Sequence, residues 1–192
     1  MTETQRSRDI LERAAKLIFK SGFEATSMQQ IAEACGLTKA GLYHHVKTKE
    51  AILVAIMHYG MDLFEEKVLH PVASITDPLE RLRETMRRNV ALVTEDSSKE
   101  VTIILHEHQT LTGEAQREIN GRKKKYVRFL EQAFREAIET KQIRADVDPT
   151  IATFSFLGSV LWTYKWYRPD GRLTPQQLSD GTIDLFFNGL VI

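Results

Sequence analysis

The stretch that most constrains the fold of this chain is FEATSMQQIAEACGLTKAGLYHHVKTKE, residues 23–50. Ser27 can cap a first short helix, with Gln30 at the spacing of a capping box. Gly36 falls where that helix has to end in a residue that tolerates left-handed geometry. Thr38 can then cap a second helix of about two turns. Two short helices joined by a glycine turn predict a helix-turn-helix, whose second helix enters the major groove of DNA.

Helical signals continue along the rest of the chain. An N-cap residue is followed by proline at the first helical position in the pairs at 77–78, 148–149 and 174–175. No run has the strict alternation of a half-buried strand, so we predict an all-α fold of about nine helices with an N-terminal helix-turn-helix head of three helices. The expected helices span about 5–21, 48–69 with Pro71 as its end, 78–94, 97–108, 113–141, 149–167 and 175–190.

The composition of the chain indicates its cellular compartment but does not predict a binding partner. Basic and acidic residues balance at 26 each, so the charge of the whole chain predicts no ligand class. Cys35 is the single cysteine, which rules out an internal disulfide and fits a reducing compartment. The first residues lack the apolar run of a signal peptide, and no stretch approaches the ~20 apolar residues of a membrane span. We therefore expect a cytoplasmic protein without a membrane partner.

The motifs FEATS, CGLTKAGLYHHV and KTKEAIL resemble the N-terminal signature of TetR-type bacterial transcriptional repressors, over about residues 8–57. The remaining two thirds are similar to that family in helix pattern more than in residues. The resemblance implies a helix-turn-helix DNA-binding domain at 1–48 and a ligand-binding and dimerisation domain at 49–192. It also implies a repressor that a small hydrophobic effector releases from DNA, with reciprocal negative coupling between the two ligands. Repressor and activator remain open as modes of action.

The second short helix carries the strongest candidates for DNA contact. Lys39 lies at its exposed N-terminal end, where side chains reach bases or phosphates. Gly41 permits close approach to DNA or, alternatively, tight helix packing. The predicted DNA-binding residues are Thr26, Ser27, Gln29, Thr38, Lys39, Ala40, Gly41, Tyr43, His44, Thr48 and Lys49. Because one short helix reads only a half-site, we expect a homodimer on a pseudo-palindromic, double-stranded operator.

The helix expected from Pro149 is apolar on more than one side, so it needs partners on more than one side. One face can meet the core of its own chain and another can meet a second subunit. The last helix offers Gly181 and Gly189 for close approach, and two helices from each subunit would form an isologous four-helix interface. The predicted interface residues are Phe154, Leu157, Leu161, Leu178, Leu185, Phe186 and Leu190.

The segment WTYKWYRPDGRLTP, residues 162–175, resembles a loop of TetR-type regulators that respond to acyl-coenzyme A thioesters of fatty acids or steroid-ring fragments. It offers aromatic rings for stacking and Lys165, Arg168 and Arg172 for phosphates. The basic run at 122–128 is either a second phosphate contact or a solvated helix face. The predicted ligand-binding residues are Met86, His106, Arg122, Tyr126, Phe129, Phe156, Trp162, Trp166 and Arg168.

Other functions stay open at this point. They are a multidrug-type regulator that senses hydrophobic aromatic compounds, a ligand-blind DNA-binding protein, and an all-α enzyme in the C-terminal part. The enzyme would need a convergent acid and base set, and the sequence has no phosphate-binding glycine loop, nucleophile elbow or zinc-spaced Cys/His cluster. His106 and His108 point about 200° apart on a helix, which argues against a shared metal ion. We expect no catalytic residue, no metal and no resident cofactor.

Overall fold

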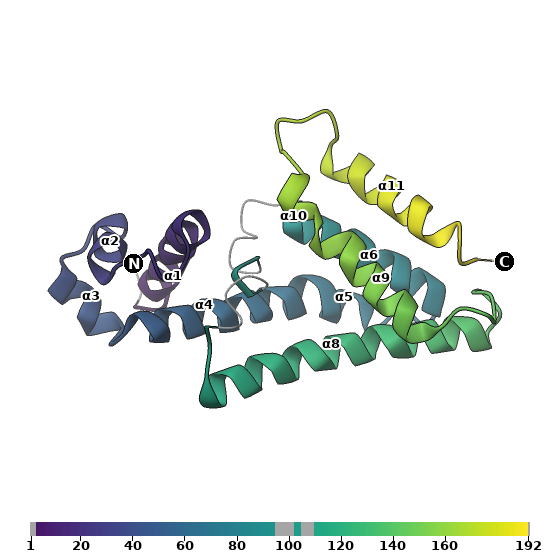
Figure 1. Cartoon of the computed structure of the whole chain (residues 1–192), viewed down its shortest axis with the longest axis horizontal. Helices are drawn as coiled ribbons and strands as arrows, with labels where there is room; N and C mark the ends of the chain where they lie inside the picture. Colours follow the sequence, from purple (N-terminus) through teal and green to yellow (C-terminus); the bar gives the residue numbers. More distant parts are fainter. Residues whose placement is uncertain (1–2, 95–101, 105–109, 192) are drawn as a thin grey trace. The chain divides into compact units, whose positions relative to one another are not determined.

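The computed structural model describes residues 3–94, 102–104 and 110–191 (Figure 1). The chain forms two compact units, one within Met1–Leu63 and Ser97–Asn120 and the other within Phe64–Asp96 and Gly121–Ile192. The described elements are helices, and the one β-type pairing among these residues is an isolated bridge between Ile143 and Val191. The predicted all-α fold with an N-terminal helix-turn-helix is therefore confirmed. No described helix has the length and apolar character that a membrane crossing requires.

The first unit contains the helices α1 (Glu3–Ser21), α2 (Met28–Ala34), α3 (Lys39–His45) and α4 (Lys49–Phe64), of which Phe64 belongs to the second unit. The residues of α8 (Gly113–Glu139) up to Asn120 also belong to the first unit. Its core takes Ile10, Ala14 and Ile18 from one face of α1, at the spacing that places residues on the same side of a helix. Leu42 of α3 and Ile52 of α4 belong to the same core, which also takes Ile103 and Ile119 from later in the chain. Burying these side chains orients the two short helices.

Local signals set the ends of the helix-turn-helix as predicted. Ser27 and Gln30 form the reciprocal capping box of α2. Gly36 has φ +65°, and the next N–H, that of Leu37, donates to the Ala32 carbonyl at 2.8 Å. Such bonds satisfy carbonyls that the end of a helix leaves without intrahelical donors. The side chain of Thr38 caps α3 by accepting from the Gly41 N–H.

A continuous helical run joins α4 to the π-helix η1 (Glu65–Leu69) and to α5 (His70–Val72). We predicted that Pro71 ends this helix, but the run passes the proline and ends at Val72. In an α-helix the N–H at position 71 would donate to the Lys67 carbonyl, and proline has no N–H. The guanidinium of Arg88 donates to that carbonyl at 3.3 Å instead. The Arg88 side chain, distant in sequence, thus satisfies the carbonyl that the proline leaves without a backbone donor.

The second unit continues with α6 (Pro78–Thr94), the part of α8 from Gly121 onward, α9 (Pro149–Leu161), α10 (Thr163–Trp166) and α11 (Pro175–Phe187). Asp77, Asp148 and Thr174 each accept a backbone N–H at the start of a helix, as their position before a proline predicted. The helix that we expected over 149–167 breaks at Trp162 into α9 and α10. The helix expected over 97–108 lies largely outside the described residues.

Helices α9 and α11 pack on α6 (Figure 1). Phe134, Phe156 and Phe187 are fully buried, and the ring of Phe156 lies 6.3 Å from that of Phe134 and 5.8 Å from that of Phe186. An ion pair between Arg81 of α6 and Glu136 of α8 joins these two helices at their edge. The core of the second unit therefore contains an aromatic cluster, and the ion pair between Arg81 and Glu136 links α6 to α8 beside it.

Candidate functional site

Helix α3 is held by a single buried side chain, that of Leu42. Around it, Lys39, Ala40, Tyr43 and His44 are exposed to solvent. The remaining turn of this surface is formed by Thr48, which is exposed and caps α4 by accepting the Ala51 N–H at 3.0 Å. The helix therefore presents a polar, partly cationic face, as the surface of a recognition helix requires.

The predicted threonine and serine contacts differ in the hydrogen-bonding capacity that they have left. Thr38 accepts the Gly41 N–H at 3.0 Å, so its hydroxyl can still donate to a phosphate oxygen. Thr48 has the same arrangement at the start of α4. In contrast, the Ser27 hydroxyl both accepts from the Gln30 N–H and donates to the Gln30 side chain. Gln29 is exposed, and its amide donates to Glu33 at 2.7 Å.

Thr26 and Lys49, which the sequence suggested as DNA contacts, have internal roles. The side chain of Thr26 is 2% exposed, and its hydroxyl donates to the Gly22 carbonyl at 2.8 Å. The Lys49 ammonium donates to the Phe23 carbonyl at 3.0 Å and lies 4.3 Å from the centroid of the Phe23 ring. These two side chains stabilise the connection between α1 and α2. We therefore do not count them in the DNA-facing set, by which we mean the predicted DNA-binding residues whose side chains face solvent.

Gly41 and Lys47 are two further residues of this surface, one with little room for a side chain and one with an exposed cation. A Cβ atom at Gly41 would lie 3.2 Å from the Thr38 hydroxyl oxygen, so a larger residue would disturb the cap of its own helix. Lys47 is exposed in the turn between α3 and α4, next to Thr48. We did not select Lys47 from the sequence, although its place in the KTKE motif could have indicated it.

A second group of predicted residues gathers along α8 and α6 in the second unit. The Arg122 guanidinium pairs with Glu65 at 3.0 Å. One turn later, the buried Tyr126 ring meets Phe64 edge-on at a centroid distance of 4.6 Å and stacks with Phe129 at 6.5 Å. Met86 of α6 is fully buried. This group combines a balanced ion pair with an aromatic wall.

A buried polar pair that sequence reasoning missed lies in the same region. The Asn89 side-chain amide donates to the Tyr126 hydroxyl at 2.9 Å. Burial raises the pKa of Tyr126 well above its usual range, so the phenol keeps its proton at physiological pH. Burial also lowers the pKa of the neighbouring Lys123. Asn89 lies seven positions after Leu82 and three after Met86, on the apolar face of α6, so its spacing could have indicated a buried polar side chain.

The remaining predicted ligand residues lie elsewhere. Trp166 and Arg168 line a hollow of about 300 Å³ with Tyr167, Gly171, Arg172 and Leu173. Phe156 belongs to the aromatic core described above, and Trp162 is exposed at the end of α9. His106 lies outside the described residues. The structure therefore divides the predicted ligand set into a buried group along α6 and α8, a core residue of α9 and a surface group between the end of α9 and Arg168.

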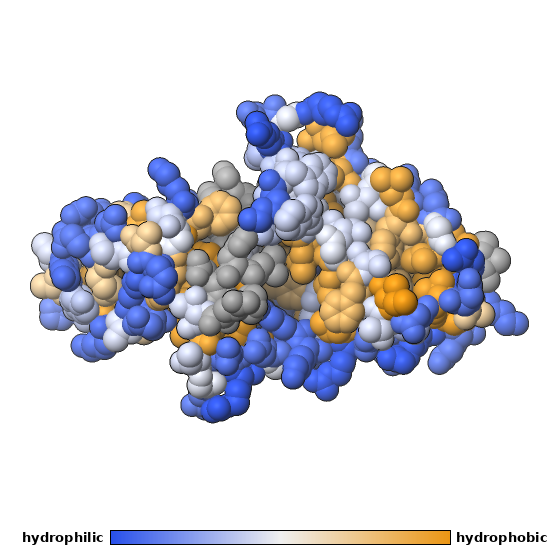
Figure 2. All heavy atoms as spheres, in the orientation of Figure 1, coloured by the Kyte–Doolittle hydropathy of each residue, from blue (hydrophilic) through white to orange (hydrophobic). Residues whose placement is uncertain are grey.

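Large apolar side chains are exposed on α9 and α11, and hydrophobic residues gather on the face over these helices in Figure 2. Leu185 is 86% exposed and Phe154 is 58% exposed, as residues of a subunit interface would be in a single chain. Ile151, which we did not predict, is 70% exposed on α9. Leu178 is 5% exposed and packs within its own unit, so it does not belong to this surface.

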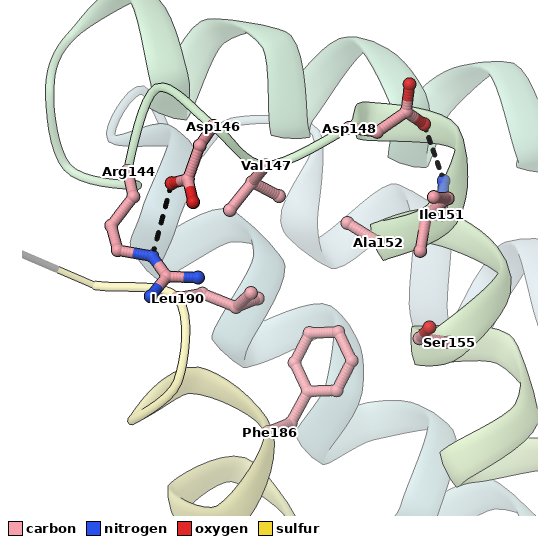
Figure 3. A pocket seen from close by; sticks show the side chains of 9 residues that line it. All are labelled: Arg144, Asp146, Val147, Asp148, Ile151, Ala152, Ser155, Phe186 and Leu190. Atoms are coloured by element: carbon pink, nitrogen blue, oxygen red, sulfur yellow. Dashed lines mark hydrogen bonds and ion pairs between the residues drawn. The ribbon is translucent and has the colours of Figure 1, made fainter.

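The other predicted interface residues, Leu157, Leu161, Phe186 and Leu190, are partly buried. Two of them, Phe186 and Leu190, line a hollow of about 290 Å³ with Ile151 and Ser155 (Figure 3). Arg144 and Asp146 form an ion pair at 3.5 Å at its edge. The hollow is open and mainly apolar, which continues the exposed apolar surface of α9.

Among the described residues, no group of three or more His, Cys, Asp or Glu side chains is arranged to hold a metal ion.

Two family models match this chain. The model described as bacterial regulatory proteins, tetR family, matches residues 10–56, and the model described as tetracyclin repressor-like, C-terminal domain, matches residues 76–190. The first match covers α2 and α3 with their capping residues, and the second covers most of α6 to α11.

Solved structures and curated relatives agree with these models. The crystal structure of AibR in complex with isovaleryl coenzyme A and operator DNA is 61% identical to this chain, with a TM-score of 0.90 over 94% of this chain and 97% of AibR. The structure of the ketosteroid transcriptional regulator KstR2 of Mycobacterium tuberculosis is 25% identical, with a TM-score of 0.91 over 100% of this chain and 97% of that chain. The curated HTH-type transcriptional repressor KstR2 of the same organism is 27% identical over 187 residues, which are 96% of this chain and 92% of that protein.

Proposed function

This chain belongs to the TetR family of bacterial transcriptional regulators, and from that premise we propose that it acts as a homodimer on a pseudo-palindromic operator from which an acyl-coenzyme A thioester releases it. Regulators of this family are DNA-binding transcription factors and not enzymes. The family assignment makes the chain a DNA-binding repressor, and we propose that it works in the cytoplasm. We assign DNA binding to residues 1–48, and effector binding and dimerisation to residues 49–192.

For DNA contact we propose the exposed side chains of Lys39, Tyr43 and His44 together with the hydroxyls of Thr38 and Thr48. The donors of these groups can form hydrogen bonds to phosphate oxygens and base edges, and the Lys39 cation is attracted to the phosphate backbone. Ala40 has a small side chain and Gly41 has none, so the backbone of α3 can approach the groove closely on this face. Ser27 and Gln29 flank α3 from the start of α2.

For dimerisation we propose the exposed faces of α9 and α11, with Ile151, Phe154 and Leu185 at their centre. Exposed apolar side chains of this size lose contact with water when a second copy covers them, which favours association. Ser155 and Gly158 lie between Ile151 and Trp162 along the exposed face of α9. Their small side chains allow two helices to approach closely. A dimer also supplies the second recognition helix that a palindrome requires.

For the effector, the proposal rests on one observation: AibR, 61% identical over nearly the whole chain, was crystallised with isovaleryl coenzyme A and operator DNA. The buried aromatic group around Tyr126 suits an acyl chain. The hollow lined by Trp166 and Arg168 offers a ring for stacking and a cation for phosphate, which suits a nucleotide.

An operator selected from random DNA allows the proposal to be tested. The full chain is bound to that operator, and fluorescence anisotropy follows its release by isovaleryl-CoA, longer acyl-CoAs, free coenzyme A, free fatty acids and hydrophobic aromatic drugs. We expect release by one or more acyl-CoAs at lower concentration than by free coenzyme A or free acids. Release by aromatic drugs alone would indicate a multidrug-type sensor, and release by none of them would indicate a ligand-blind DNA-binding protein.

A further inference from the structure

Asn89 and Tyr126 form a buried polar pair between α6 and α8, and the direction of their hydrogen bond is fixed. The Asn89 Nδ2 atom donates to the Thr85 carbonyl oxygen at 2.8 Å and to the Tyr126 hydroxyl oxygen at 2.9 Å. A carbonyl oxygen can only accept, so the amide nitrogen must face Thr85. The Tyr126 oxygen therefore accepts from Asn89, and its own proton points elsewhere.

That phenolic proton has no acceptor in the described part of the chain. The Tyr126 ring contacts the rings of Phe64 and Phe129, and neither of these two side chains carries an oxygen or nitrogen atom. Tyr126 is nevertheless a buried residue. Buried donors are nearly always hydrogen-bonded in folded proteins, so an oriented donor without an acceptor among the described residues is suited to a bound ligand that brings one.

The charge around Tyr126 indicates what kind of partner fits. Arg122 lies one turn before Tyr126 on α8, and its charge is balanced by Glu65 at 3.0 Å. The tyrosine itself stays neutral because burial opposes its ionisation. A carboxylate would bring a negative charge into this neutral aromatic setting, whereas a carbonyl oxygen accepts a hydrogen bond and adds no charge.

We propose that Tyr126, oriented by Asn89, donates a hydrogen bond to the carbonyl oxygen of the effector's thioester. The inference rests on the acyl-coenzyme A effector proposed above and adds the group that recognises the acyl linkage. Arg122, Phe64 and Phe129 then form the wall around that linkage. This pair lets the protein distinguish an acylated coenzyme A from the free thiol and from the free acid.

The test compares two ligands that differ only at the carbonyl. Isothermal titration calorimetry gives the Kd of isovaleryl-CoA and of its thioether analogue S-(3-methylbutyl)-CoA, in which a methylene replaces the carbonyl. The wild-type chain should bind the thioester about ten times more tightly, the typical effect of leaving one buried donor unpaired. In Tyr126→Phe the ratio of the two Kd values should fall to about one. The matched variant Tyr164→Phe, which removes a hydroxyl from α10, should keep the wild-type ratio.

The result separates this inference from the proposed function. If the wild-type chain binds both ligands equally well, or if Tyr126→Phe keeps the wild-type ratio, the carbonyl contact is overturned while the acyl-coenzyme A effector stands. If the wild-type chain binds neither ligand, both proposals are overturned. Because each ratio is taken within one protein, a general change in affinity or stability does not affect it. Should Tyr126→Phe fail to fold, the wild-type ratio and Asn89→Leu, which removes the orienting amide, decide the question in the same way.

Discussion

Lys39 and Lys49 are each the first residue of a helix, α3 and α4, and their ammonium groups have different surroundings. Lys39 is exposed, and no described acid pairs with it. Lys49 donates to the Phe23 carbonyl and lies over the Phe23 ring. The same residue type at the same helical position is therefore available to DNA in one case and occupied within the fold in the other.

Replacing Lys39 by alanine should weaken DNA binding without weakening the fold. We expect the Kd for the selected operator to rise about tenfold and the salt dependence of log K to fall by about one unit of slope, as for the loss of one phosphate contact. Fluorescence anisotropy over a series of KCl concentrations measures both. Lys124→Ala, which removes an exposed lysine from α8, should leave both unchanged. An unchanged salt slope in Lys39→Ala would remove this residue from the DNA interface.

Replacing Lys49 by alanine should have the opposite profile. Its hydrogen bond to a backbone carbonyl comes from a charged donor, so the free energy of unfolding should fall by about 1–3 kcal/mol. Urea denaturation followed by circular dichroism measures this loss. A variant with wild-type stability and weakened operator binding would return Lys49 to the DNA-facing set.

At the scale of helices, starts were predictable and interruptions were not. Ser27, Thr38 and Asp148 cap helices through backbone atoms three residues away, so each signal is contained in a few consecutive residues. Where the helix passes Pro71, the Lys67 carbonyl accepts from Arg88, which lies 17 positions after the proline, so this support has no local sequence signal. The role of Lys49 is long-range in the same way, because its ammonium donates to the Phe23 carbonyl 26 positions earlier. Thr26 donates to the Gly22 carbonyl only four positions away, so its role could have been considered from the sequence.

The apolar face of α9 and α11 leads to a prediction about association. Replacing Leu185 by glutamate places a charge on a side chain that is 86% exposed in the single chain. The helix content of each subunit should persist, while the dimer dissociates because a buried, unpaired charge is strongly unfavourable. Sedimentation equilibrium should give a mass near the 22.0 kDa of one chain. Lys124→Glu on α8 should remain dimeric, and a dimeric Leu185→Glu would exclude this face as the interface.

For the molecule as a whole, the sequence predicted the proposed DNA-binding part, residues 1–48, in more detail than the proposed effector-binding part, residues 49–192. The helix-turn-helix is specified by residues that are close together in the chain, whereas a ligand site is assembled from helices distant in sequence. Tyr126 was predicted and its partner Asn89 was not: the spacing of Asn89 from Leu82 and Met86 indicates burial, but no local signal pairs it with a residue 37 positions away. The predicted residues Phe156 and Arg168 likewise lie in separate parts of the second unit.

The central claim is that operator and acyl-coenzyme A bind the same protein with opposing effects. Calorimetry can measure the Kd of isovaleryl-CoA for the free chain and for the chain saturated with its selected operator. We predict that the operator weakens isovaleryl-CoA binding at least about fivefold, and that isovaleryl-CoA weakens operator binding by the same factor, since coupling between two ligands is reciprocal. Equal affinities of isovaleryl-CoA for the free and DNA-bound chain would contradict the account.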